Sequence, residues 1–471
     1  MPFLDRLQRW AGERPDSTAV VVAGQGLSWE QLRDAAAALV PAAPAVTVVS
    51  EANSLHFAVS FAASVAGERQ CAVLDPTWPQ QLQDSITERI AETVRRAAPV
   101  TGHGRTDELI DGPPDAPFLI GLTSGTTSVP KAFTRTRRSW QVSFDASIEF
   151  FGLTPEDRTL APGPLAASLN LYALAECLYA GSEFHTLPKF DVGDVHAAVS
   201  HDGITRLVLI PTMLRLLSER GLAGGVDASG IRSIICAGSK LDARTLDAAR
   251  RWAPNATIFE YYGASELSFV AGAGLQPGQR PRLGGTGIGK PFPGVEIRIL
   301  DGAGAAVPEG SDGNICVRSG MVSEGYLWGD DGQALQCFDG WYTVGDQGYL
   351  SGGTLHLLGR RSDMIITAGT NVYPHEVELA LASVPGVASA VAAGLADDLR
   401  GQRVVAAVVP SHGGVTAMQL RAGVEDVLAR DKRPLEYFAL TELPLTDRGK
   451  LSRQLLLDWI TGHDPRARRL G

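Results

Sequence analysis

Short runs of β-forming residues alternate with helical segments over the first half of the chain. The β-rich runs lie at 46–50, 70–74, 118–122, 206–210, 231–236 and 257–260. Segments with helical spacing of apolar residues lie between them, for example at 55–66 and 80–97. Strands that alternate with helices build a parallel sheet with crossover helices. The alternation therefore predicts an α/β fold with parallel-type sheets in the N-terminal part.

The pattern changes twice further along the chain. From about residue 284, short strands are divided by Gly, Asp and Pro turns, which predicts a meander or a small β-barrel-like part. After Gly359 a mixed α/β pattern returns, with helices expected near 374–383 and at 417–430. For 471 residues we therefore expect a large N-terminal domain over 1–359 and a small, mobile α/β C-terminal domain over 360–471.

The composition excludes several classes of protein. The net charge is −10 at pH 7, whereas a nucleic-acid surface needs clustered Lys and Arg. No apolar run is long enough to span a membrane, and the N-terminus lacks the pattern of a signal peptide. The five cysteines form no Cys-x-x-Cys pair, which fits reduced thiols. We expect a cytoplasmic protein with no nucleic-acid partner and no dedicated transition-metal site.

The most informative stretch is Leu122–Lys131, Leu-Thr-Ser-Gly-Thr-Thr-Ser-Val-Pro-Lys. Hydroxyl side chains surround Gly125 after an apolar run, and such a loop turns N–H and O–H groups toward one anion. Lys131 adds a positive charge, so a phosphate is the natural guest. The spacing is not that of a Walker A loop. A polar surface turn is the alternative interpretation.

A second motif is Tyr261-Tyr-Gly-Ala-Ser-Glu266, directly after the expected strand at 257–260. Tyr-Gly can present a ring and a close backbone to a planar base, and Glu266 is a hard oxygen ligand suited to Mg²⁺. One alternative is a strand-to-helix turn with Ser265 as the N-cap. A hydrolase nucleophile elbow is disfavoured because Leu267 stands where its last glycine is required.

Three further motifs follow. An Asp after a tight Gly turn, as in Trp341–Asp346, can accept both hydroxyls of a ribose, although a β-turn Asp is the alternative. Gly359–Glu376 and Pro444–Lys450 could each be a linker or a solvated basic turn.

Gly285–Pro291 is interpreted as a turn before the strand expected at 296–300, because Pro291 forbids the helix of a dinucleotide motif.

In this order the five motifs resemble those of the adenylate-forming superfamily, which includes acyl- and aryl-CoA synthetases, nonribosomal-peptide adenylation domains and luciferases. The resemblance covers essentially the whole chain and is greatest to a stand-alone acyl-CoA synthetase. This sequence departs from the usual pattern with Ser265 and Val344 where Thr is usual, and with Ser362 where a hinge Asp or Lys is common. Ala166 and Ala167 replace the aromatic or His that often closes the acyl pocket.

The resemblance implies a role for each matching position. The catalytic residues would be Lys450, Glu266 and Thr126, of which Glu266 and Thr126 would lie near Mg²⁺. The ATP- or AMP-binding residues would be Ser124, Gly125, Thr127, Lys131, Gly238, Ser239, Lys240, Tyr261, Tyr262, Gly263, Ala264, Ser265, Asp346 and Arg360. Within this set, Gly238, Ser239, Lys240, Tyr261 and Tyr262 would line the adenine, and Asp346 and Arg360 would hold the ribose. Ser362 would be the hinge, Gly369 would line the thiol tunnel, and Ala167 and Ser168 would line the acyl pocket.

The same resemblance implies ATP-dependent activation of a carboxylic acid to an acyl-adenylate, with transfer to coenzyme A. We expect a non-amino acid substrate, because the segment that binds an α-ammonium in amino-acid-activating relatives offers no clear Asp. The apolar runs at 169–178 and 207–217 could line a hydrophobic acyl pocket or belong to the core. No carrier-protein domain follows Lys450 before Gly471, which favours coenzyme A. A ligase that loads a separate acyl-carrier protein, and a nucleotide-binding protein without ligase activity, remain alternatives.

Overall fold

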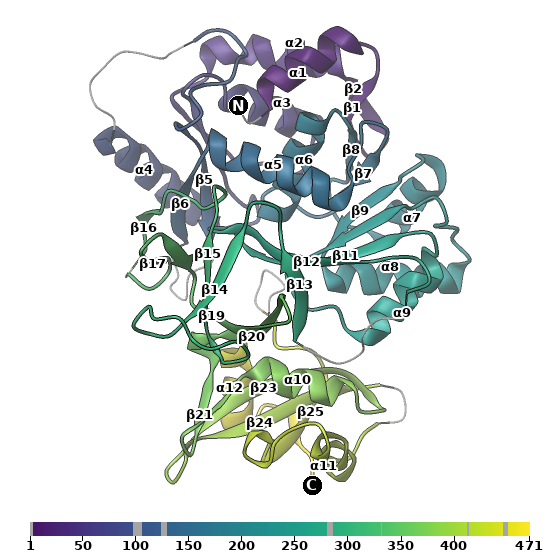
Figure 1. Ribbon diagram of the computed structural model, residues 1–471. Helices are drawn as coiled ribbons and strands as arrows, with labels where there is room; N and C mark the ends of the chain where they lie inside the picture. The colour runs from purple at the N-terminus through teal and green to yellow at the C-terminus, as the bar shows by residue number, and fades with distance from the viewer. Residues whose placement is uncertain are drawn as a thin grey trace. The chain divides into compact units, whose positions relative to one another are not determined.

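The computed structural model describes residues 3–97, 106–123, 130–279, 286–330, 332–411, 414–445 and 451–471. The chain forms two compact units, the first from 1–281, 288–298 and 316–344 and the second from 282–287, 299–315 and 345–471. Figure 1 labels their helices and strands. The boundary expected at 359/360 stays a prediction about which parts move relative to each other.

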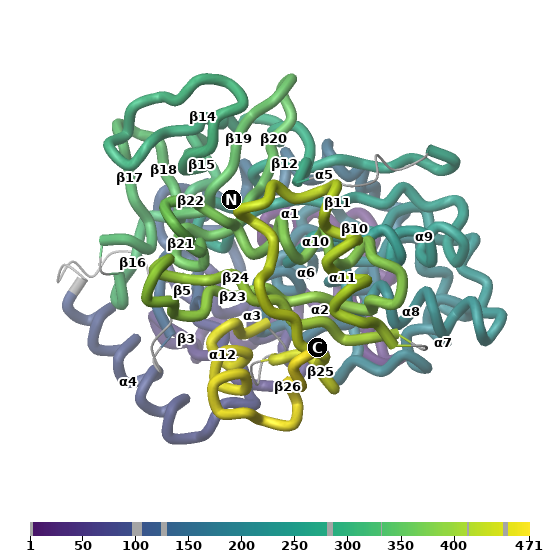
Figure 2. Tube along the Cα trace, turned by 90° about the horizontal axis from the view of Figure 1, so that it is seen from below, coloured from purple at the N-terminus to yellow at the C-terminus, as the bar shows by residue number. Residues whose placement is uncertain are grey.

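One sheet of the first unit carries both ends of the candidate phosphate loop. Its strands are β3 (Val46–Val49), β4 (Gln70–Val73), β5 (Pro117–Thr123), β6 (Lys131–Thr136) and β16 (Tyr326–Trp328), in the order β16-β6-β5-β4-β3. β3, β4 and β5 are parallel, whereas β6 and β16 are antiparallel. Helices α3 (Leu55–Ser64) and α4 (Gln80–Ala97) connect the parallel strands. α4 lies beside this sheet in both views (Figure 1 and Figure 2), and its Ile86 and Ile90 pack in one buried cluster with Ala72.

A second sheet of the first unit contains the Tyr-Gly motif. Its strands are β1 (Thr18–Val22), β2 (Gln25–Ser28), β7 (Arg158–Leu160), β8 (Glu183–Thr186), β9 (Arg206–Leu209), β10 (Ser233–Cys236), β11 (Thr257–Ala264), β12 (Ser268–Leu275) and β13 (Gly287–Pro291). Their order is β13-β12-β11-β10-β9-β7-β8-β1-β2. The strands from β1 through β11 in this order pair in parallel, and β2, β12 and β13 pair antiparallel.

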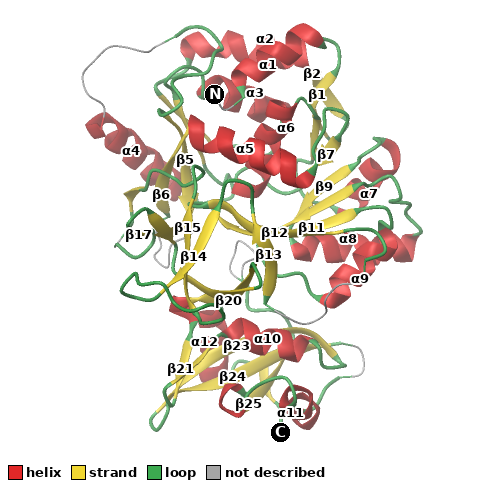
Figure 3. Ribbon diagram, viewed as in Figure 1, coloured by secondary structure: helices red, strands yellow, loops and turns green. Residues whose placement is uncertain are grey.

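Helices pack on both faces of this sheet. The helices of the first unit besides α3 and α4 are α1 (Leu4–Glu13), α2 (Trp29–Leu39), α5 (Arg137–Phe151), α6 (Ser168–Ala180), α7 (Val192–His201), α8 (Pro211–Gly224) and α9 (Ala243–Trp252). Leu207 and Leu209 of β9 are buried in one cluster with residues of α7, α8 and α9, which lie beside β9 and β11 in Figure 3. Arg206 points to the opposite face, since side chains alternate along a strand, and it pairs with Glu176 of α6 at 2.7 Å. The apolar run at 207–217 therefore contributes to the core.

The Tyr-Gly motif lies in a hairpin. β11 continues through Tyr261–Ala264 and pairs antiparallel with β12, so the alternative of a strand-to-helix turn with Ser265 as N-cap is wrong. The strands approach closely at Gly263, where a Cβ would stand 2.2 Å from the Ser268 carbonyl oxygen. The Leu267 side chain is fully buried and anchors the turn. Glycine at 263 and burial of Leu267 together explain why the chain turns back here.

The segment at Gly285–Pro291 also differs from expectation. Within its described part, 286–291, residues Gly287–Pro291 form strand β13 and not a turn. β13 pairs with β12 through Ala271 with Pro291 and Gly272 with Lys290. Gly289 has φ of +146°, and a Cβ there would lie 2.0 Å from the Gly272 carbonyl oxygen. The glycines permit this close pairing. Antiparallel strands therefore begin earlier in the chain than residue 284, where the sequence predicted the change to short strands.

Shorter antiparallel strands follow. They are β14 (Glu296–Leu300), β15 (Gly313–Arg318), β17 (Gln336–Phe338), β18 (Trp341–Thr343), β19 (Asp346–Ser351) and β20 (Thr354–Arg360). In the second unit, β15 pairs with β19 at Asn314 and Gln347, and β19 and β20 form a hairpin. This hairpin places Asp346 directly opposite Arg360.

The C-terminal part of the second unit is a mixed sheet covered on both faces. Its elements are β21 (Ile365–Thr367), β22 (Thr370–Val372), α10 (Pro374–Ala382), β23 (Val387–Asp397), β24 (Gly401–Pro410), α11 (Ala417–Glu425), β25 (Glu436–Leu440), α12 (Arg453–Thr461) and β26 (Ala467–Arg469). Val404 and Ala406 of β24 pack with α10 and α11, whereas Val405 and Ala407 pack with α12 on the other face. Two buried faces explain why β24 is a continuous apolar run from residue 404 to its end.

The helix expected at 417–430 ends earlier, at Glu425. Arg433 Nη2 donates to the Glu425 carbonyl oxygen at 2.6 Å, and Arg433 Nε donates to the Leu428 carbonyl oxygen at 2.9 Å. These bonds satisfy carbonyls that would otherwise need further helical turns. Among the described helices of the chain, none is long and apolar enough to cross a membrane.

Candidate active site

The candidate phosphate loop is bracketed by two paired strands. Ser124, Gly125, Thr126 and Thr127 lie outside the described residues, so their expected roles stay predictions. The flanking residues are described: Thr123 at the end of β5 is paired with Lys131 at the start of β6. The two described residues that flank this segment in the sheet therefore lie side by side, with Lys131 at the start of β6.

Lys131 and Glu266 both interact with Tyr326. The Lys131 ammonium lies 6.0 Å from the centre of the Tyr326 ring. The Tyr326 hydroxyl donates a hydrogen bond to Glu266 Oε1. Burial and the neighbouring Glu266 carboxylate raise the pKa of Tyr326, so the phenol stays protonated and keeps donating. Tyr326 thus links a cation at the start of β6 with a carboxylate in the turn between β11 and β12.

Glu266 is held through its backbone as well as its side chain. Ser323 N–H donates to the Glu266 carbonyl oxygen at 2.8 Å. The residue is 8% exposed, so its carboxylate is largely shielded from solvent. A shielded carboxylate in a fixed direction, near a lysine, fits a Mg²⁺ ion bound to phosphates. In the described parts of the chain, no group of three His, Cys, Asp or Glu side chains could hold a metal by itself, so such an ion would also need oxygens from a nucleotide.

The residues expected around the acid lie next to Ser265. Ser168 begins helix α6, and its Oγ lies 3.3 Å from Ser265 Oγ. Ala167 is the N-cap of this helix and makes no side-chain cap bond. A helix N-terminus favours negative charge. The two hydroxyls and the helix end therefore form a polar corner suited to a carboxylate, although the acyl-pocket role of Ala167 and Ser168 stays a prediction.

The expected adenine-side residues come from the ends of neighbouring parallel strands. Gly238, Ser239 and Lys240 follow β10, and Lys240 Nζ contacts Glu260 Oε2 of β11 at 2.6 Å. Leu241 N–H donates to the other Glu260 oxygen at 2.7 Å. These contacts hold the loop after β10 against β11.

Tyr261 and Tyr262 do not share a face. Adjacent side chains point to opposite sides of a strand, and the Tyr261 ring packs in an aromatic cluster, 4.9 Å from the Phe269 ring and 5.8 Å from the Phe151 ring. Tyr262 is 8% exposed. Both residues were expected to line one adenine, but only one ring can do so from a given side of β11.

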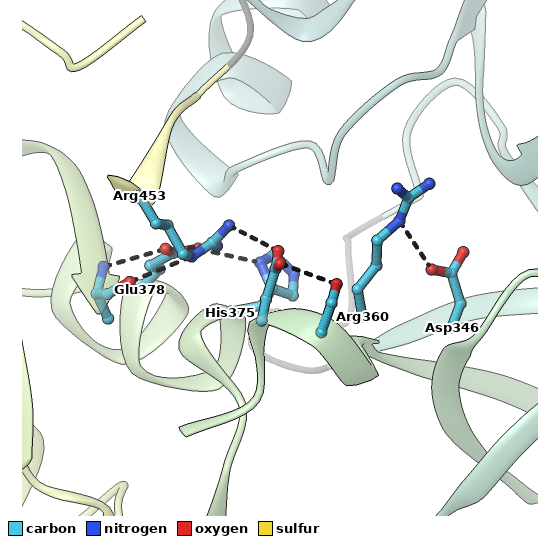
Figure 4. A network of polar contacts seen from close by, with 8 residues as sticks. Asp346, Arg360, His375, Glu378 and Arg453 are labelled. Atoms are coloured by element: carbon cyan, nitrogen blue, oxygen red, sulfur yellow. Dashed lines mark hydrogen bonds and ion pairs between the residues drawn. The ribbon is translucent and has the colours of Figure 1, made fainter. Parts of the chain in front are cut away.

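In the second unit, Asp346 and Arg360 lie together as expected. Gly345 has φ of +82° and turns the chain into β19. Arg360 Nε lies 3.2 Å from Asp346 Oδ1 (Figure 4). The Asp346 side chain is 9% exposed and that of Arg360 is 61% exposed. A carboxylate at a turn with an exposed cation beside it fits the hydroxyls of a ribose, and this role stays a prediction.

The expected hinge and thiol-tunnel residues lie in turns of the same unit. Ser362 belongs to a short 3-10 helix, Arg361–Asp363, and is exposed. Gly369 stands in the two-residue turn between β21 and β22, where Ala368 and Gly369 both have positive φ, 48° and 82°. Such a turn suits the twist of a hairpin. This geometry does not test the hinge role expected for Ser362 or the thiol-tunnel role expected for Gly369, and both roles stay predictions.

Lys450 lies outside the described residues, but Arg453, which follows it closely, is fixed. Figure 4 shows Arg453 reaching Glu378 of α10, and Arg453 Nη2 lies 2.8 Å from Glu378 Oε1. Arg453 Nη1 lies 3.2 Å from Asp363 Oδ2. Burial opposes ionisation of Glu378, but the bond from His375 and the charge of Arg453 outweigh it and lower the Glu378 pKa. The start of α12 is thereby tied to the segment that contains Ser362.

Sequence reasoning missed Tyr326, and it also missed Arg135 of β6, whose Nη2 donates to the Ser265 carbonyl oxygen at 2.5 Å. Both act through contacts between segments far apart in the chain, which a single sequence does not reveal. One signal existed for Arg135, because residues 131, 133 and 135 share a face of a strand and this face begins at Lys131. No comparable signal existed for Tyr326, which is paired across the sheet with Phe133.

The family described as AMP-binding enzyme matches residues 42–327, and its C-terminal domain, AMP-binding enzyme C-terminal domain, matches residues 376–450. The first match alone covers more than half of the 471 residues. The chain belongs to the AMP-binding enzyme family. A relative described as an uncharacterized acyl-CoA ligase, YhfT of Bacillus subtilis (strain 168), is 30% identical over 442 residues, which are 89% of each chain.

Other members of the AMP-binding enzyme family extend this picture. Indoleacetate–CoA ligase of Aromatoleum aromaticum is 33% identical over 346 residues, 72% of this chain and 66% of the relative. The structure of o-succinylbenzoate CoA synthetase from Bacillus subtilis with its acyl-adenylate intermediate covers 99% of both chains at 26% identity and a TM-score of 0.80. The amide bond synthetase McbA from Marinactinospora thermotolerans covers 97% of this chain and 99% of its own at 26% identity and a TM-score of 0.79.

These findings confirm three expectations. The resemblance to the adenylate-forming superfamily, the α/β fold with its large and small parts, and the class of enzyme, an adenylate-forming acyl-CoA ligase, are all borne out. The o-succinylbenzoate synthetase has also been solved with ATP and a magnesium ion, at 26% identity over 95% of this chain. None of the relatives named here is described as acting on a carrier protein.

Proposed function

We propose that this enzyme uses ATP, Mg²⁺ and coenzyme A to convert a carboxylic acid into its CoA thioester through an acyl-adenylate. The observation that carries the proposal is that Tyr326 interacts with both Lys131, which directly follows the phosphate loop, and Glu266. The polar corner of Ser168 and Ser265 adds the place for the acid. The family supports the same reaction, because its named members include acyl- and aryl-CoA ligases.

The chemistry explains why few proton-transfer groups are needed. A carboxylate oxygen attacks the α-phosphorus of ATP, an O–P bond forms, and the bond to pyrophosphate breaks. The thiolate of coenzyme A then attacks the acyl carbonyl, and AMP leaves with the former carboxylate oxygen. Both steps depend on orientation and on charges placed where negative charge develops. When bound, Mg²⁺ supplies positive charge at the ATP phosphates.

This chain's residues divide that work between them. Lys131 would bind phosphate oxygens, with Ser124, Thr126 and Thr127 of the loop. Glu266, oriented by Tyr326, would hold the magnesium ion. Lys450 would bridge the carboxylate and the α-phosphate.

The second half-reaction calls for a different arrangement of the two domains. We propose that residues 360–471 turn about Ser362, so that Lys450 serves adenylation and the Gly369 turn serves thioester formation. Two motifs of the C-terminal part, each suited to one half-reaction, support this division. The boundary at 359/360 belongs to the same proposal.

The acid is proposed to be hydrophobic and without an α-amino group, with room for bulk near Ala166 and Ala167. Coenzyme A is the proposed acceptor, and the cytoplasm is the proposed location, in keeping with cysteines that form no Cys-x-x-Cys pair. None of the relatives named above is described as acting on a carrier protein. The similarity to an amide bond synthetase makes amines worth including as competing acceptors.

The test is a panel of carboxylic acids, assayed for pyrophosphate release from ATP and then for thioester formation with coenzyme A. We expect release only when an acid is present, and a CoA thioester as product. Glu266→Gln should abolish release, whereas the matched change Glu324→Gln, an exposed carboxylate on the neighbouring segment, should not. Acid-independent release, or acylation of an added amine or carrier protein in place of coenzyme A, would refute the proposal.

A further inference from the structure

Arg135 of β6 is a buried cation next to the candidate magnesium carboxylate. It is 3% exposed. Its Nη2 donates to the Ser265 carbonyl oxygen at 2.5 Å, and its Nη1 donates to the Met321 carbonyl oxygen. The Ser265 carbonyl immediately precedes Glu266, and Met321 begins the segment that leads to Tyr326. One guanidinium therefore joins two segments that are distant in the sequence.

Glu266 lies between those two segments. The segment after Met321 binds it twice, through Ser323 N–H at 2.8 Å to its carbonyl oxygen and through the Tyr326 hydroxyl to its carboxylate. Arg135 of β6 adds a third contact, because its guanidinium binds the Ser265 carbonyl oxygen directly before Glu266. Because the guanidinium is planar and presents its donors in a fixed fork, it sets the separation of the Ser265 and Met321 carbonyls. The direction of the Glu266 carboxylate depends on that separation.

The free-energy cost of burying the charged Arg135 side chain indicates that its hydrogen bonds have a role beyond packing. Burial lowers the Arg135 pKa to about 10, against the opposing charges of Glu266 and Tyr172. Among the described residues no carboxylate forms an ion pair with it. A buried cation without an ion-pair partner is expensive, and an apolar side chain would fill the same space at lower cost. Packing alone therefore does not explain an arginine at this position.

Arg137 provides a comparison within the same unit. It is fully buried, and its guanidinium donates to the carbonyl oxygens of Ala116, Pro117, Val65 and Arg69 at 3.0–3.2 Å. It too joins backbone segments, but none of them includes Glu266 or Ser265. Arg137 therefore shows what a purely structural arginine does in this fold.

We propose that Arg135 is a positioning residue for adenylation, which fixes the Glu266 carboxylate toward the magnesium ion by bridging the Ser265 and Met321 carbonyls. The inference rests on the proposed function, because it assumes that Glu266 holds Mg²⁺ with ATP. It adds a residue of this chain that touches neither ATP nor the acid. Residues that orient a metal ligand commonly contribute 10- to 100-fold to metal affinity or activity.

The experiment compares Arg135→Met with Arg137→Met. Calorimetry without any acid measures how much Mg²⁺ increases the affinity for ATP, and the Mg²⁺ concentration for half-maximal pyrophosphate release is measured separately. We expect Arg135→Met to lose roughly 10- to 100-fold of the magnesium-dependent gain. Arg137→Met should melt at a lower temperature and keep the gain. Arg135→Lys, which keeps the charge but not the fork, should lie between Arg135→Met and the parent.

Two outcomes overturn the inference. One is an Arg135→Met protein that is folded and keeps the parent's magnesium-dependent gain, or loses no more of it than Arg137→Met. If Arg135→Met does not fold, Arg135→Lys provides the test. A magnesium-dependent gain in Arg135→Lys that equals the parent's then contradicts the inference. Failure of the proposed function looks different, because the parent itself would then release no pyrophosphate with any acid, while calorimetry would still report on Arg135.

Discussion

Asp111 carries a charge that the fold disfavours. Its Oδ2 accepts a hydrogen bond from Asp5 N–H at 3.0 Å, but its buried Oδ1 has no hydrogen-bond partner among the described residues. Burial raises the pKa of Asp111 from 3.8 to about 6, although Arg137 lowers it in part. A buried carboxylate with an unsatisfied oxygen is costly once it ionises.

The pH dependence of stability should reveal Asp111. A folded-state pKa above the unfolded value means that folded protein binds the proton more tightly, so this contribution to stability is lost as pH rises from about 4 to about 6. Asp111→Asn should therefore be more stable than the parent at pH 8, by up to about 2–3 kcal/mol, and equal to it at pH 4. Melting curves of both proteins at the two pH values check this. A stability difference that does not change with pH would contradict it.

Ala167 tests the acyl pocket. It is a half-buried alanine that caps α6 beside the Ser168–Ser265 pair. If this corner opens into the acyl site, Ala167→Phe should lower kcat/KM for bulky acids by at least about 10-fold more than for short ones, because an added ring overfills the space. The comparison is the ratio of the two kcat/KM values in variant and parent. An equal loss for every acid would mean that the substitution only damages packing.

At the scale of residues, the roles implied by the motifs predicted that Asp346 and Arg360 act together, and the two side chains are paired. The contact between Ser168 and Ser265 was not predicted, because the two residues were assigned to different sites. The contacts of Arg135, Tyr326 and Asp111 were not predicted either, because their partners arrive through the fold from distant segments. The opposite facing of Tyr261 and Tyr262 could have been predicted, since alternation is a property of any strand.

Among the elements, helix α12 is closest in the sequence to Lys450, because it begins at Arg453. Arg453 at its start is held by Glu378 at 2.8 Å, and Arg453 Nε donates to the Ala392 carbonyl oxygen at 3.2 Å. The side chains are 25% and 12% exposed, so the pair is mostly shielded. Removing one partner leaves the other charge uncompensated.

We expect Arg453→Met to destabilise the protein by roughly 1–3 kcal/mol, less than a fully buried pair because Arg453 is partly exposed. Adenylation should also slow, since the end of the Lys450 loop is no longer fixed. Adding Glu378→Met should recover much of the stability but not the adenylation rate. Denaturant unfolding of both single variants and the double variant measures the coupling. Additive losses would show that the two side chains do not stabilise each other.

Element prediction succeeded where hydrophobic spacing was long and regular. The helices expected at 55–66 and 80–97 are present as α3 (Leu55–Ser64) and α4 (Gln80–Ala97). It failed at the β11–β12 hairpin and at β13, where glycine allows strands to approach closely and local residues look like turn formers. The early end of α11 depends on Arg433, a side chain beyond the helix.

For the whole molecule, the sequence was most informative through the order of its motifs. Each motif alone has an ordinary alternative, but their order specifies one family, and the family matches confirm it. The acid, the acceptor and the motion of the parts depend on shape and on states that motif order does not encode. They stay proposals with the tests given.

Lys450 tests the division of labour between the two half-reactions. If it meets the α-phosphate only during adenylation, Lys450→Ala should lower that rate by about 10²–10³. Thioester formation from supplied acyl-adenylate should stay near the parent rate. Lys432→Ala, which loses an ion pair with Glu376 in the same compact unit, controls for general damage. Equal losses in both half-reactions, in a protein that melts like the parent, would refute alternation of the domains.

Transfer of carboxylate oxygen to AMP tests the central claim most directly. The best acid from the panel is labelled with ¹⁸O in both carboxylate oxygens and incubated with ATP, Mg²⁺, coenzyme A and the enzyme, and the products are analysed by mass spectrometry. Attack of the carboxylate on the α-phosphorus predicts AMP with one ¹⁸O and a thioester that keeps the other. Unlabelled AMP, or label in inorganic phosphate or pyrophosphate, would contradict an acyl-adenylate intermediate and with it the account of this site.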